Sequence, residues 1–483
     1  MRRGPSTRSD ATDAAELRLA QAAPLTARRV LYAGDNFEGF LAAYGRRNPN
    51  APVQYFAGEA QDDALVDLVV LGPGAPLEDL LASVRLAAGG ALAIAGGAHG
   101  EKPSAQLAAR GFTVVKTRGT ETQPVWIAQD AADARHGRLH VEFWAFAPKL
   151  LDIRTRLPTT QLDTDPRIVA HFRTAPFNLP DLPDRTPRIV ICQRPGAYSL
   201  QALRQWLAPT LAAGWLPVLE YDDHPELVAA VTGVASSEQT WNIARGMAAV
   251  QVSTEKLAEA FLRHNPEVAV FPNSVFDLPP FPEGDRPRRV FYGAVTRGPF
   301  AVEVARSLTP AIRQFPDTEF VVVGDQAVFD ALPTRRKRLE SYMPYERYLE
   351  LMRTCTVTLS PLSGGPAHEA KSDAKFLDAA QSGALIIASP LVYADVVRHG
   401  ENGLIARSRE QWAPLLARAL RDPGKRREMA RRAWQEVRDR RMFADQIGRR
   451  RDWYLELWAR RDALQREICD RLPGLREAIS ALR

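Results

Sequence analysis

Short apolar runs alternate with amphipathic segments along most of the chain. The runs end in turn-forming residues such as glycine and proline, and the segments between them carry apolar residues at every third or fourth position. Continuous apolar strands that alternate with helices are typical of a parallel sheet with helices on both faces. The pattern therefore predicts an α/β protein built from strand–helix repeats.

The repeats fall into three series. The first predicts strands at 29–33, 52–57, 66–72, 90–95, 112–116 and 124–128, with helices at 37–47, 76–87 and 104–110. The second predicts strands at 188–192, 216–221, 248–252 and 268–271, with helices at 199–213, 236–245 and 254–263. The third predicts strands at 289–292, 319–323, 357–359 and 385–388, with helices between them and from 411 to the end. Each series predicts one Rossmann-like unit, and the two adjacent strands that close the first should pair antiparallel.

Breaks in the pattern mark the domain boundaries. Prolines and charges recur over 130–188, which predicts coil and edge strands. The turn-rich stretch 278–287 separates the second and third series. The expected parts are a disordered tail at 1–28, a Rossmann-like domain at 29–130, two further domains at 140–285 and 286–440, and C-terminal helices at 441–483.

Composition narrows the class of protein. The chain has 483 residues, 45% hydrophobic and 25% charged, which suits a globular protein of about three domains. Its longest apolar runs fall short of the roughly 18–20 residues that a membrane-spanning helix needs. Cys192, Cys355 and Cys469 are too far apart for a disulfide framework or a Cys-x-x-Cys metal site. The N-terminus carries no secretory signal, so we expect a cytoplasmic protein.

The net charge of +6 is concentrated near the C-terminus. Residues 421–466 contain 15 Lys and Arg against 8 Asp and Glu, a net of +7. In the same region Trp453, Tyr454, Leu457 and Trp458 share one helix face. This face predicts either core packing or peripheral association with the anionic inner face of a membrane. Nucleic acid is not an expected partner, because no recognition motif is present.

Lysine is rare in this chain, with 8 of the 63 basic residues, so two lysines close together stand out. A predicted strand ends at Leu359, a loop with Ser363, Gly364 and Gly365 follows, and a helix is expected from about 367 to 381. Lys371 and Lys375 are four residues apart and would share one face of that helix. Compact ammonium groups near a helix N-terminus favour phosphate binding, and the alternative is a solvated helix face.

The same segment resembles the donor-binding half of family 4-type glycosyltransferases, which are retaining enzymes of the two-Rossmann GT-B fold. The resemblance is carried by Lys371-Ser372-x-x-Lys375, Asp378, Gly383, Ser389 and Asp395-x4-Gly400-x-Asn402-Gly403-Leu404. It extends to residues 342–348, Val252-Ser253 and Pro272-Asn273, and covers about 188–440. It implies that the last two units form a GT-B pair, with the acceptor domain first, the donor domain second and a cleft between them.

The resemblance also implies an activity. The protein would transfer a sugar from a nucleoside-diphosphate-sugar to a carbohydrate, lipid-linked or protein acceptor, in surface polysaccharide or glycoconjugate assembly. Lys371, Ser372 and Lys375 would hold the diphosphate, and Asp378 would accept hydrogen bonds from the ribose. No cofactor or metal is expected, because the family relies on basic side chains and helix dipoles. The family's first glutamate is replaced here by Ala370, although Glu369 is adjacent.

Two further loops are candidates. Gly293 would let the donor approach the backbone and Arg297 would neutralise the leaving phosphate, or this loop is an ordinary αβ turn. Asp222 follows a strand and would position the acceptor, or it caps a turn. The candidate catalytic residues are Asp222, Arg297 and Lys371. The candidate donor-binding residues are Gly293, Arg297, Gly364, Gly365, Glu369, Lys371, Ser372, Lys375 and Asp378.

The first unit resembles a shortened S-adenosylmethionine-dependent methyltransferase. The likeness rests on the strand 66–71, the segment 88–92 and the closing strand pair. Residues 34–39 lack the family's glycine-rich run, and a portion between 57 and 66 is missing. The alternatives to a glycosyltransferase are therefore a methyltransferase–glycosyltransferase fusion, or a catalytically silent scaffold, which the missing glutamate allows.

Overall fold

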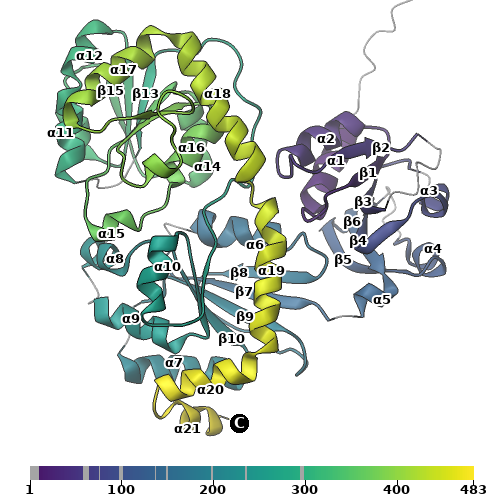
Figure 1. Cartoon of the computed structure of the whole chain (residues 1–483). Helices are drawn as coiled ribbons and strands as arrows, with labels where there is room; N and C mark the ends of the chain where they lie inside the picture. The colour runs from purple at the N-terminus through teal and green to yellow at the C-terminus, as the bar shows by residue number, and fades with distance from the viewer. Residues whose placement is uncertain are drawn as a thin grey trace, which may run out of the picture. The chain divides into compact units, whose positions relative to one another are not determined.

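The computed structural model confirms the α/β class with three Rossmann-like units. It describes residues 10–57, 65–75, 77–96, 102–135, 137–147, 151–196, 199–233, 237–293 and 298–482. Three six-stranded sheets are each flanked by helices (Figure 1). Among the described residues, none of the helices combines the length and the apolar character that crossing a membrane requires.

The chain divides into two compact units. The first contains Met1–Gln193, Trp206–Val218 and Met442–Arg483, and the second contains Arg194–Gln205 and Leu219–Arg441. The first sheet lies wholly in unit 1, and the third lies wholly in unit 2. The domain bounds expected from the sequence stay a prediction.

The first sheet has the strand order β2-β1-β3-β4-β6-β5. Its strands are β1 (Val30–Ala33), β2 (Val53–Tyr55), β3 (Val66–Leu71), β4 (Leu86–Ala95), β5 (Phe112–Thr120) and β6 (Gln123–Asp130). Its helices are α2 (Phe37–Gly45), α3 (Leu77–Ser83), α4 (Ser104–Ala109) and α5 (Ala131–Ala134). Strands β5 and β6 pair antiparallel, as predicted. Leu31, Val69 and Leu92 from neighbouring strands share a core with Leu80 and Leu107 from the helices.

The prediction of a disordered tail at 1–28 is wrong for the described part of it. Helix α1 (Asp10–Ala22) buries Leu19, and the chain after it buries Leu25. Glu16 is also buried and accepts a 2.7 Å hydrogen bond from the hydroxyl of Tyr32 on β1. Alanine, leucine, glutamate and glutamine dominate this segment and are strong helix formers, a signal that the expectation overlooked.

The middle sheet corrects the expectation for 130–188. Strand β7 (Leu139–Ala145) pairs parallel with both β8 (Ile168–Arg173) and β9 (Arg188–Gln193), so it is an interior strand. Between β7 and β8 lie a π-helical turn, η2 (Asp152–Arg156), and α6 (Leu157–Leu162). Pro158 falls in the first turn of α6, where a missing backbone N–H costs little, so proline does not exclude a helix here. The rest of the sheet follows as β10 (Leu216–Tyr221), β11 (Ala249–Val252) and β12 (Val268–Val270), with α7 (Leu200–Ala212), α8 (Pro225–Thr232), α9 (Ser237–Gly246) and α10 (Glu255–Leu262).

The third sheet has the order β15-β14-β13-β16-β17-β18, with every pair parallel. Its strands are β13 (Arg289–Gly293), β14 (Glu319–Val323), β15 (Lys337–Glu340), β16 (Val357–Ser360), β17 (Leu385–Ala388) and β18 (Leu404–Ile405). Its helices include α11 (Pro299–Ser307), α12 (Thr309–Gln314), α13 (Gln326–Ala331), α14 (Tyr345–Arg353), α17 (Trp412–Arg421) and α18 (Pro423–Arg440). The sequence pattern missed β15 and β18. The first is a polar edge strand, and the second is too short to show a period.

The last three helices are α19 (Ala444–Ala459), α20 (Arg461–Arg471) and α21 (Leu475–Ser480). Tyr454, Leu457 and Trp458 on α19 are buried. The predicted aromatic face is therefore used mainly for packing. What remains exposed on these helices is largely charged.

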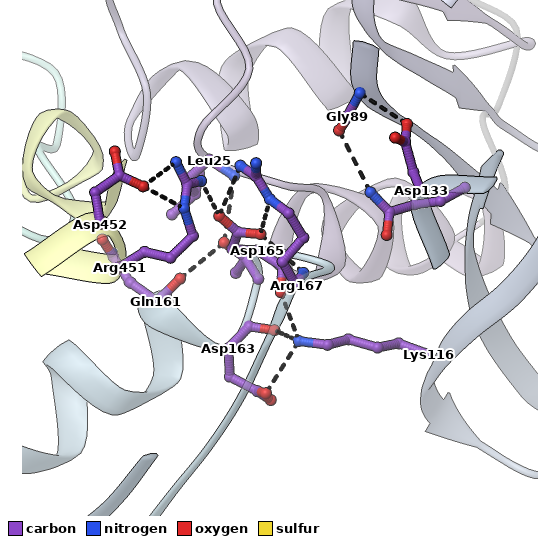
Figure 2. Close-up of polar contacts among 12 residues, drawn as sticks. Leu25, Gly89, Lys116, Asp133, Gln161, Asp163, Asp165, Arg167, Arg451 and Asp452 are labelled. Carbon is purple, nitrogen blue, oxygen red and sulfur yellow. Dashed lines mark hydrogen bonds and ion pairs between the residues drawn. The ribbon is translucent and has the colours of Figure 1, made fainter. Parts of the chain in front are cut away.

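A buried aspartate, Asp165, connects three segments of unit 1 through its carboxylate and its backbone carbonyl (Figure 2). Asp165 is fully buried, and its oxygens lie 3.3 Å from Nε of Arg167 and 2.8 Å from Nη1 of Arg451 on α19. Lys116 on β5 donates hydrogen bonds to the Asp165 carbonyl at 2.8 Å and to Asp163 Oδ1 at 3.1 Å. The turn between α6 and β8 thus binds both the first sheet and helix α19.

Candidate functional site

The strand order of the third sheet marks where a ligand can bind. Strands β13 and β16 are neighbours, and the chain runs outward from them in opposite directions. In open α/β sheets of this order, ligands bind outside the carboxyl ends of the strands at this switch point. Gly293 ends β13, and the loop with Gly364 and Gly365 follows β16. The sheet therefore places the predicted donor-binding segment at its ligand-binding edge.

The single helix expected from about 367 to 381 is interrupted. Helix α15 (Pro366–Glu369) is one turn long, and α16 (Ala374–Gln381) begins after a break. We call Ala370–Asp373 the break segment. The prediction that Lys371 and Lys375 share a helix face is therefore wrong, because Lys371 lies in the break and Lys375 in the first turn of α16. Serine and aspartate favour helix starts over helix interiors, and Asp373 occupies the N-cap position of α16.

Each residue of the break segment is held by a hydrogen bond or an ion pair. The Thr254 hydroxyl at the start of α10 donates to the Ala370 carbonyl at 2.8 Å, and the side-chain amide of Asn273 donates to the Ser372 hydroxyl at 2.8 Å. Arg441 binds Asp373 through two contacts of 2.6 and 3.0 Å, and also donates to the Asn273 carbonyl at 3.0 Å. These contacts fix the backbone on both sides of Lys371.

Lys371 itself forms an ion pair with Asp223, which follows β10. Its Nζ lies 3.0 Å from Oδ1 of Asp223. The other oxygen of Asp223 lies 2.8 Å from Nη2 of Arg194, and Nε of Arg194 lies 2.5 Å from Oδ1 of Asp222. Arg194 follows β9 and has a φ of 45°, a conformation that costs energy for a residue other than glycine. We call Arg194, Asp222, Asp223 and Lys371 the ion-pair cluster.

Opposing effects set the charge states in the cluster. Burial disfavours the charged form of Asp223, but the cations of Arg194 and Lys371 outweigh it and lower the pKa of Asp223. Burial likewise opposes the charge on Arg194, yet Asp222 and Asp223 raise the pKa of its guanidinium. Asp223 is therefore a carboxylate and Arg194 a guanidinium cation at neutral pH. Asp222, a candidate catalytic residue, is engaged with Arg194.

Lys375 belongs to a separate network. Its Nζ donates to the Tyr348 hydroxyl at 2.8 Å and to Asp378 Oδ2 at 3.2 Å. The Tyr345 hydroxyl donates to Asp378 Oδ1 at 2.7 Å. Burial, followed by the negative charge of Asp378, raises the pKa of Tyr345 well above its usual value. Asp378 is buried, and both of its oxygens bind protein groups, so its predicted contact with a ribose stays a prediction.

Gly293 is required by packing. A Cβ at this position would lie 2.7 Å from the Tyr348 hydroxyl and closer still to the ring of Phe291, so no side chain fits. The Tyr348 hydroxyl also lies 3.4 Å from the Gly293 carbonyl oxygen. Tyr348 therefore joins Lys375 to the end of β13, and the space that the glycine leaves holds protein atoms.

The other candidates fall in different environments. Gly364 is exposed, and Gly365 precedes α15 with a φ of 133°. Glu369 is exposed and pairs with Lys256 on α10 at 3.0 Å. Ser372 lies in the break segment. Arg297 lies outside the described residues.

Sequence reasoning missed Arg194, Thr254 and Arg441 as parts of this site. Arg194 directly follows the carboxyl end of a strand, the position at which polar residues of α/β proteins gather, and this signal could have identified it. Thr254 and Arg441 carry no local signal in the sequence. The partner of Thr254 lies 116 positions away along the chain, and that of Arg441 lies 68 positions away. Within the described ranges, no group of three His, Cys, Asp or Glu side chains is placed to hold a metal ion.

Two glycines at the corresponding edge of the first sheet are tightly packed. A Cβ at Gly34, after β1, would lie 2.7 Å from the Tyr32 hydroxyl and 2.9 Å from the Cα of Gly72, after β3. A Cβ at Gly72 would meet Tyr32 and the Glu16 carboxylate. Tyr32 and Glu16 thus pack closely against both glycines at this edge. The resemblance of this unit to methyltransferases stays a prediction.

One family model matches the part of the chain that contains the two lysines. Residues 300–448 match the family model described as "Glycosyl transferase-like". This segment contains β14–β18, both lysines, the break segment and Asp378. The predicted resemblance to glycosyltransferases is thereby confirmed for residues 300–448. No curated protein matches the chain in sequence.

Several solved structures are similar to part of the chain. HepE of Anabaena, solved with UDP and glucose, is 13% identical with a TM-score of 0.46, over 66% of this chain and all of its own. Sucrose-phosphate synthase of Thermosynechococcus elongatus is 16% identical with a TM-score of 0.46, over 67% of this chain and all of its own. TarM of S. aureus, solved as a mutant with fondaparinux, a GlcNAc-glycerol and UDP, is 14% identical with a TM-score of 0.41, over 56% of this chain. The match spans only 55% of the TarM chain, about half its length.

Proposed function

We propose that this protein is a glycosyltransferase that moves a sugar from a nucleoside-diphosphate-sugar to an acceptor hydroxyl. One observation carries the proposal. Two of the chain's few lysines, Lys371 and Lys375, lie in the segment that matches the glycosyltransferase family, and the Lys375 network reaches the end of β13 at the switch point. Ammonium groups at that edge of the sheet are suited to a diphosphate.

The lysines would stabilise the leaving group. When the bond between the anomeric carbon and the phosphate oxygen breaks, negative charge grows on the diphosphate, and fixed cations lower the energy of that state. The acceptor oxygen forms the new bond, and its proton passes to the departing phosphate oxygen. We propose that the acceptor attacks from the face that the diphosphate leaves, with retention at the anomeric carbon.

We propose that no metal ion is needed for this step. Lys371 and Lys375 supply two positive charges, and Ser372 in the break segment adds a hydroxyl donor. A chelator should therefore leave turnover unchanged at constant ionic strength. Turnover that is lost with a chelator and restored by a divalent cation would contradict this part of the proposal.

We also propose the class of acceptor and the location of the protein in the cell. A carbohydrate, lipid-linked or protein acceptor in surface polysaccharide or glycoconjugate assembly fits the activity. A location in the cytoplasm, or at the inner face of the membrane, fits the net +7 of residues 421–466. Because α19 buries most of its aromatic face, such attraction would be electrostatic and would fall as salt is raised.

Thermal unfolding of the full chain with a panel of nucleoside diphosphates and their sugars tests the activity class. A ligand present at 100 times its dissociation constant adds about 2.7 kcal/mol to stability, so at least one panel member should raise the midpoint by several degrees. Sugars that bind should then be consumed in the presence of an acceptor panel. Binding without any turnover would favour the silent scaffold, and no binding at all would contradict a donor site.

A further inference from the structure

The ammonium group that the proposed function assigns to the donor is already neutralised by the protein. Lys371 Nζ lies 3.0 Å from Asp223 Oδ1, and both side chains are only partly exposed, at 30% and 29%. We propose that Asp223 is a built-in counter-ion that occupies Lys371 until the diphosphate of the donor displaces it. This inference rests on the proposed function, because it takes Lys371 to bind phosphate.

The geometry allows the exchange without leaving a buried charge unpaired. Asp223 uses one oxygen for Lys371 and the other for Arg194, which lies 2.8 Å away. When Lys371 turns to a phosphate, Asp223 keeps its guanidinium partner. Arg194 in turn is held by Asp222, so its position does not depend on Lys371. Removal of one partner from a buried pair is costly when nothing replaces it, and here both separated ions keep or gain a partner.

Charge balance explains why the exchange must occur. The ion-pair cluster holds two carboxylates, one ammonium and one guanidinium, so its formal charge is zero. A diphosphate that entered while Asp223 still held Lys371 would meet a carboxylate within a few ångströms of the same ammonium, and like charges at that distance repel. Donor affinity is therefore set by the difference between the Lys371–phosphate and Lys371–Asp223 interactions. Asp223 lowers donor affinity and limits it to ligands with enough negative charge.

This competition gives an unusual expectation for a binding-site mutation. Asp223→Asn removes the charge that competes for Lys371, so nucleoside diphosphates should bind more tightly than to the parent. The gain should be about tenfold, the scale of one charge-assisted hydrogen bond. A nucleoside without phosphates makes no contact with Lys371, and its affinity should not change. If Asp223 had only a structural role, Asp223→Asn would lower the affinity for both kinds of ligand or for neither.

Asp222→Asn is the matched control. Asp222 and Asp223 are adjacent, and each gives one carboxylate oxygen to Arg194, but Lys371 contacts Asp223. Both substitutions therefore weaken one ion pair of Arg194. Asp223→Asn also releases Lys371 from its carboxylate partner, whereas Asp222→Asn does not. Asp223→Ser also removes the carboxylate, so it should raise the affinity for diphosphates as well. It serves as a second variant in case the asparagine disturbs the fold.

The experiment is calorimetric titration of the full chain with UDP, ADP and GDP, and with uridine, adenosine and guanosine. The diphosphate that binds the parent should bind Asp223→Asn and Asp223→Ser about tenfold more tightly. Asp222→Asn leaves the Asp223–Lys371 pair in place and should give no such gain. In a Lys371→Ala background, Asp223→Asn should give no gain.

Two failures can be told apart. If no diphosphate binds the parent, the proposed function fails and the inference fails with it. If the parent binds a diphosphate but folded Asp223 variants bind it no more tightly, the donor site stands and the counter-ion role is overturned. A gain that persists without Lys371 would also overturn it, because the competition would then act elsewhere.

Discussion

The side-chain amide of Asn273 donates a 2.8 Å hydrogen bond to the hydroxyl of Ser372, a residue 99 positions later in the chain. Asn273 lies just after β12, and Ser372 lies beside Lys371 in the break segment. Together with Thr254 and Arg441, this contact holds the segment that interrupts the helix after β16. The position of Lys371 therefore depends on residues outside its own helix.

Asn273→Ala should loosen the break segment. We expect a loss of about 0.5–1.5 kcal/mol in the free energy of unfolding, the usual contribution of one hydrogen bond. The KM for the donor should rise more than kcat falls, because Lys371 and Ser372 are less well positioned before binding. Urea unfolding and donor saturation curves measure the two effects. Ser274→Ala is the control, since the Ser274 hydroxyl bonds locally to the Pro272 carbonyl; equal rises in KM for both variants would remove the positioning role.

Lys371→Ala and Lys375→Ala should each weaken the binding of the donor diphosphate. Loss of a charge-assisted hydrogen bond corresponds to about 1.5–3 kcal/mol, or roughly ten- to a hundredfold in donor affinity or turnover. Arginine at either position should restore only part of the loss, because a planar fork needs different geometry from a point charge. Lys425→Ala is the control, because this lysine on α18 is largely exposed. Steady-state kinetics on folded variants provide the comparison, and parent-like values for both lysine variants would show that the donor binds elsewhere.

Arg451→Ala should strongly destabilise unit 1. Asp165 is fully buried, and among the described residues Arg167 is the ion-pair partner that remains without Arg451, so we expect a loss of up to about 3–5 kcal/mol. Burial opposes the charge on Asp165, but Arg167 and Arg451 outweigh it and lower its pKa. Such a group stabilises the fold above its unfolded pKa of about 3.9 and loses this contribution as the pH falls through its folded pKa. The deficit of Arg451→Ala should therefore be full at pH 7 and shrink in acid.

Denaturant unfolding at pH 7 and at about pH 3 measures this dependence. Asp452→Asn serves as the control, because Asp452 is exposed and its pair with Arg451 should contribute less than about 1 kcal/mol. A deficit for Arg451→Ala no larger than that of the control would mean that Arg167 alone compensates the buried carboxylate.

The first unit should not bind S-adenosylmethionine. The backbone of Gly34 approaches Gly72, and the hydrogen-bonded pair Tyr32 and Glu16 packs closely against Gly72 after β3. Calorimetric titration of the full chain should show no heat of binding. Micromolar affinity that Asp35→Ala abolishes would contradict this account of the unit.

Periodicity and turn residues were sufficient to predict most of the strands and helices. Apolar runs such as 319–323 and 385–388 predict buried parallel strands from their local composition alone. The antiparallel closing pair could also be predicted, because no helix separates β5 from β6. Helix α6 is not evident from the sequence, because proline interrupts most helices but is tolerated in the first turn, where Pro158 lies.

The site was harder to predict than the fold. The rarity of lysine singles out Lys371 and Lys375 as candidates, but their side chains reach different partners because the helix is interrupted between them. The interruption depends on Thr254, Asn273 and Arg441, which are distant in sequence. Pairing of Lys371 with Asp223, 148 positions earlier, likewise has no local signal. Long-range polar contacts of this kind follow from the three-dimensional arrangement and not from any period in the sequence.

The central claim is that Lys371 and Lys375 bind the diphosphate of a nucleoside-diphosphate-sugar. Its most direct test is an equilibrium titration of UDP-, ADP- and GDP-sugars against the parent and the Lys371→Ala/Lys375→Ala double variant. We predict that at least one donor binds the parent and that its affinity falls by about a hundredfold or more in a double variant with the parent's circular dichroism spectrum. Equal affinity of the two proteins for that donor would contradict the claim.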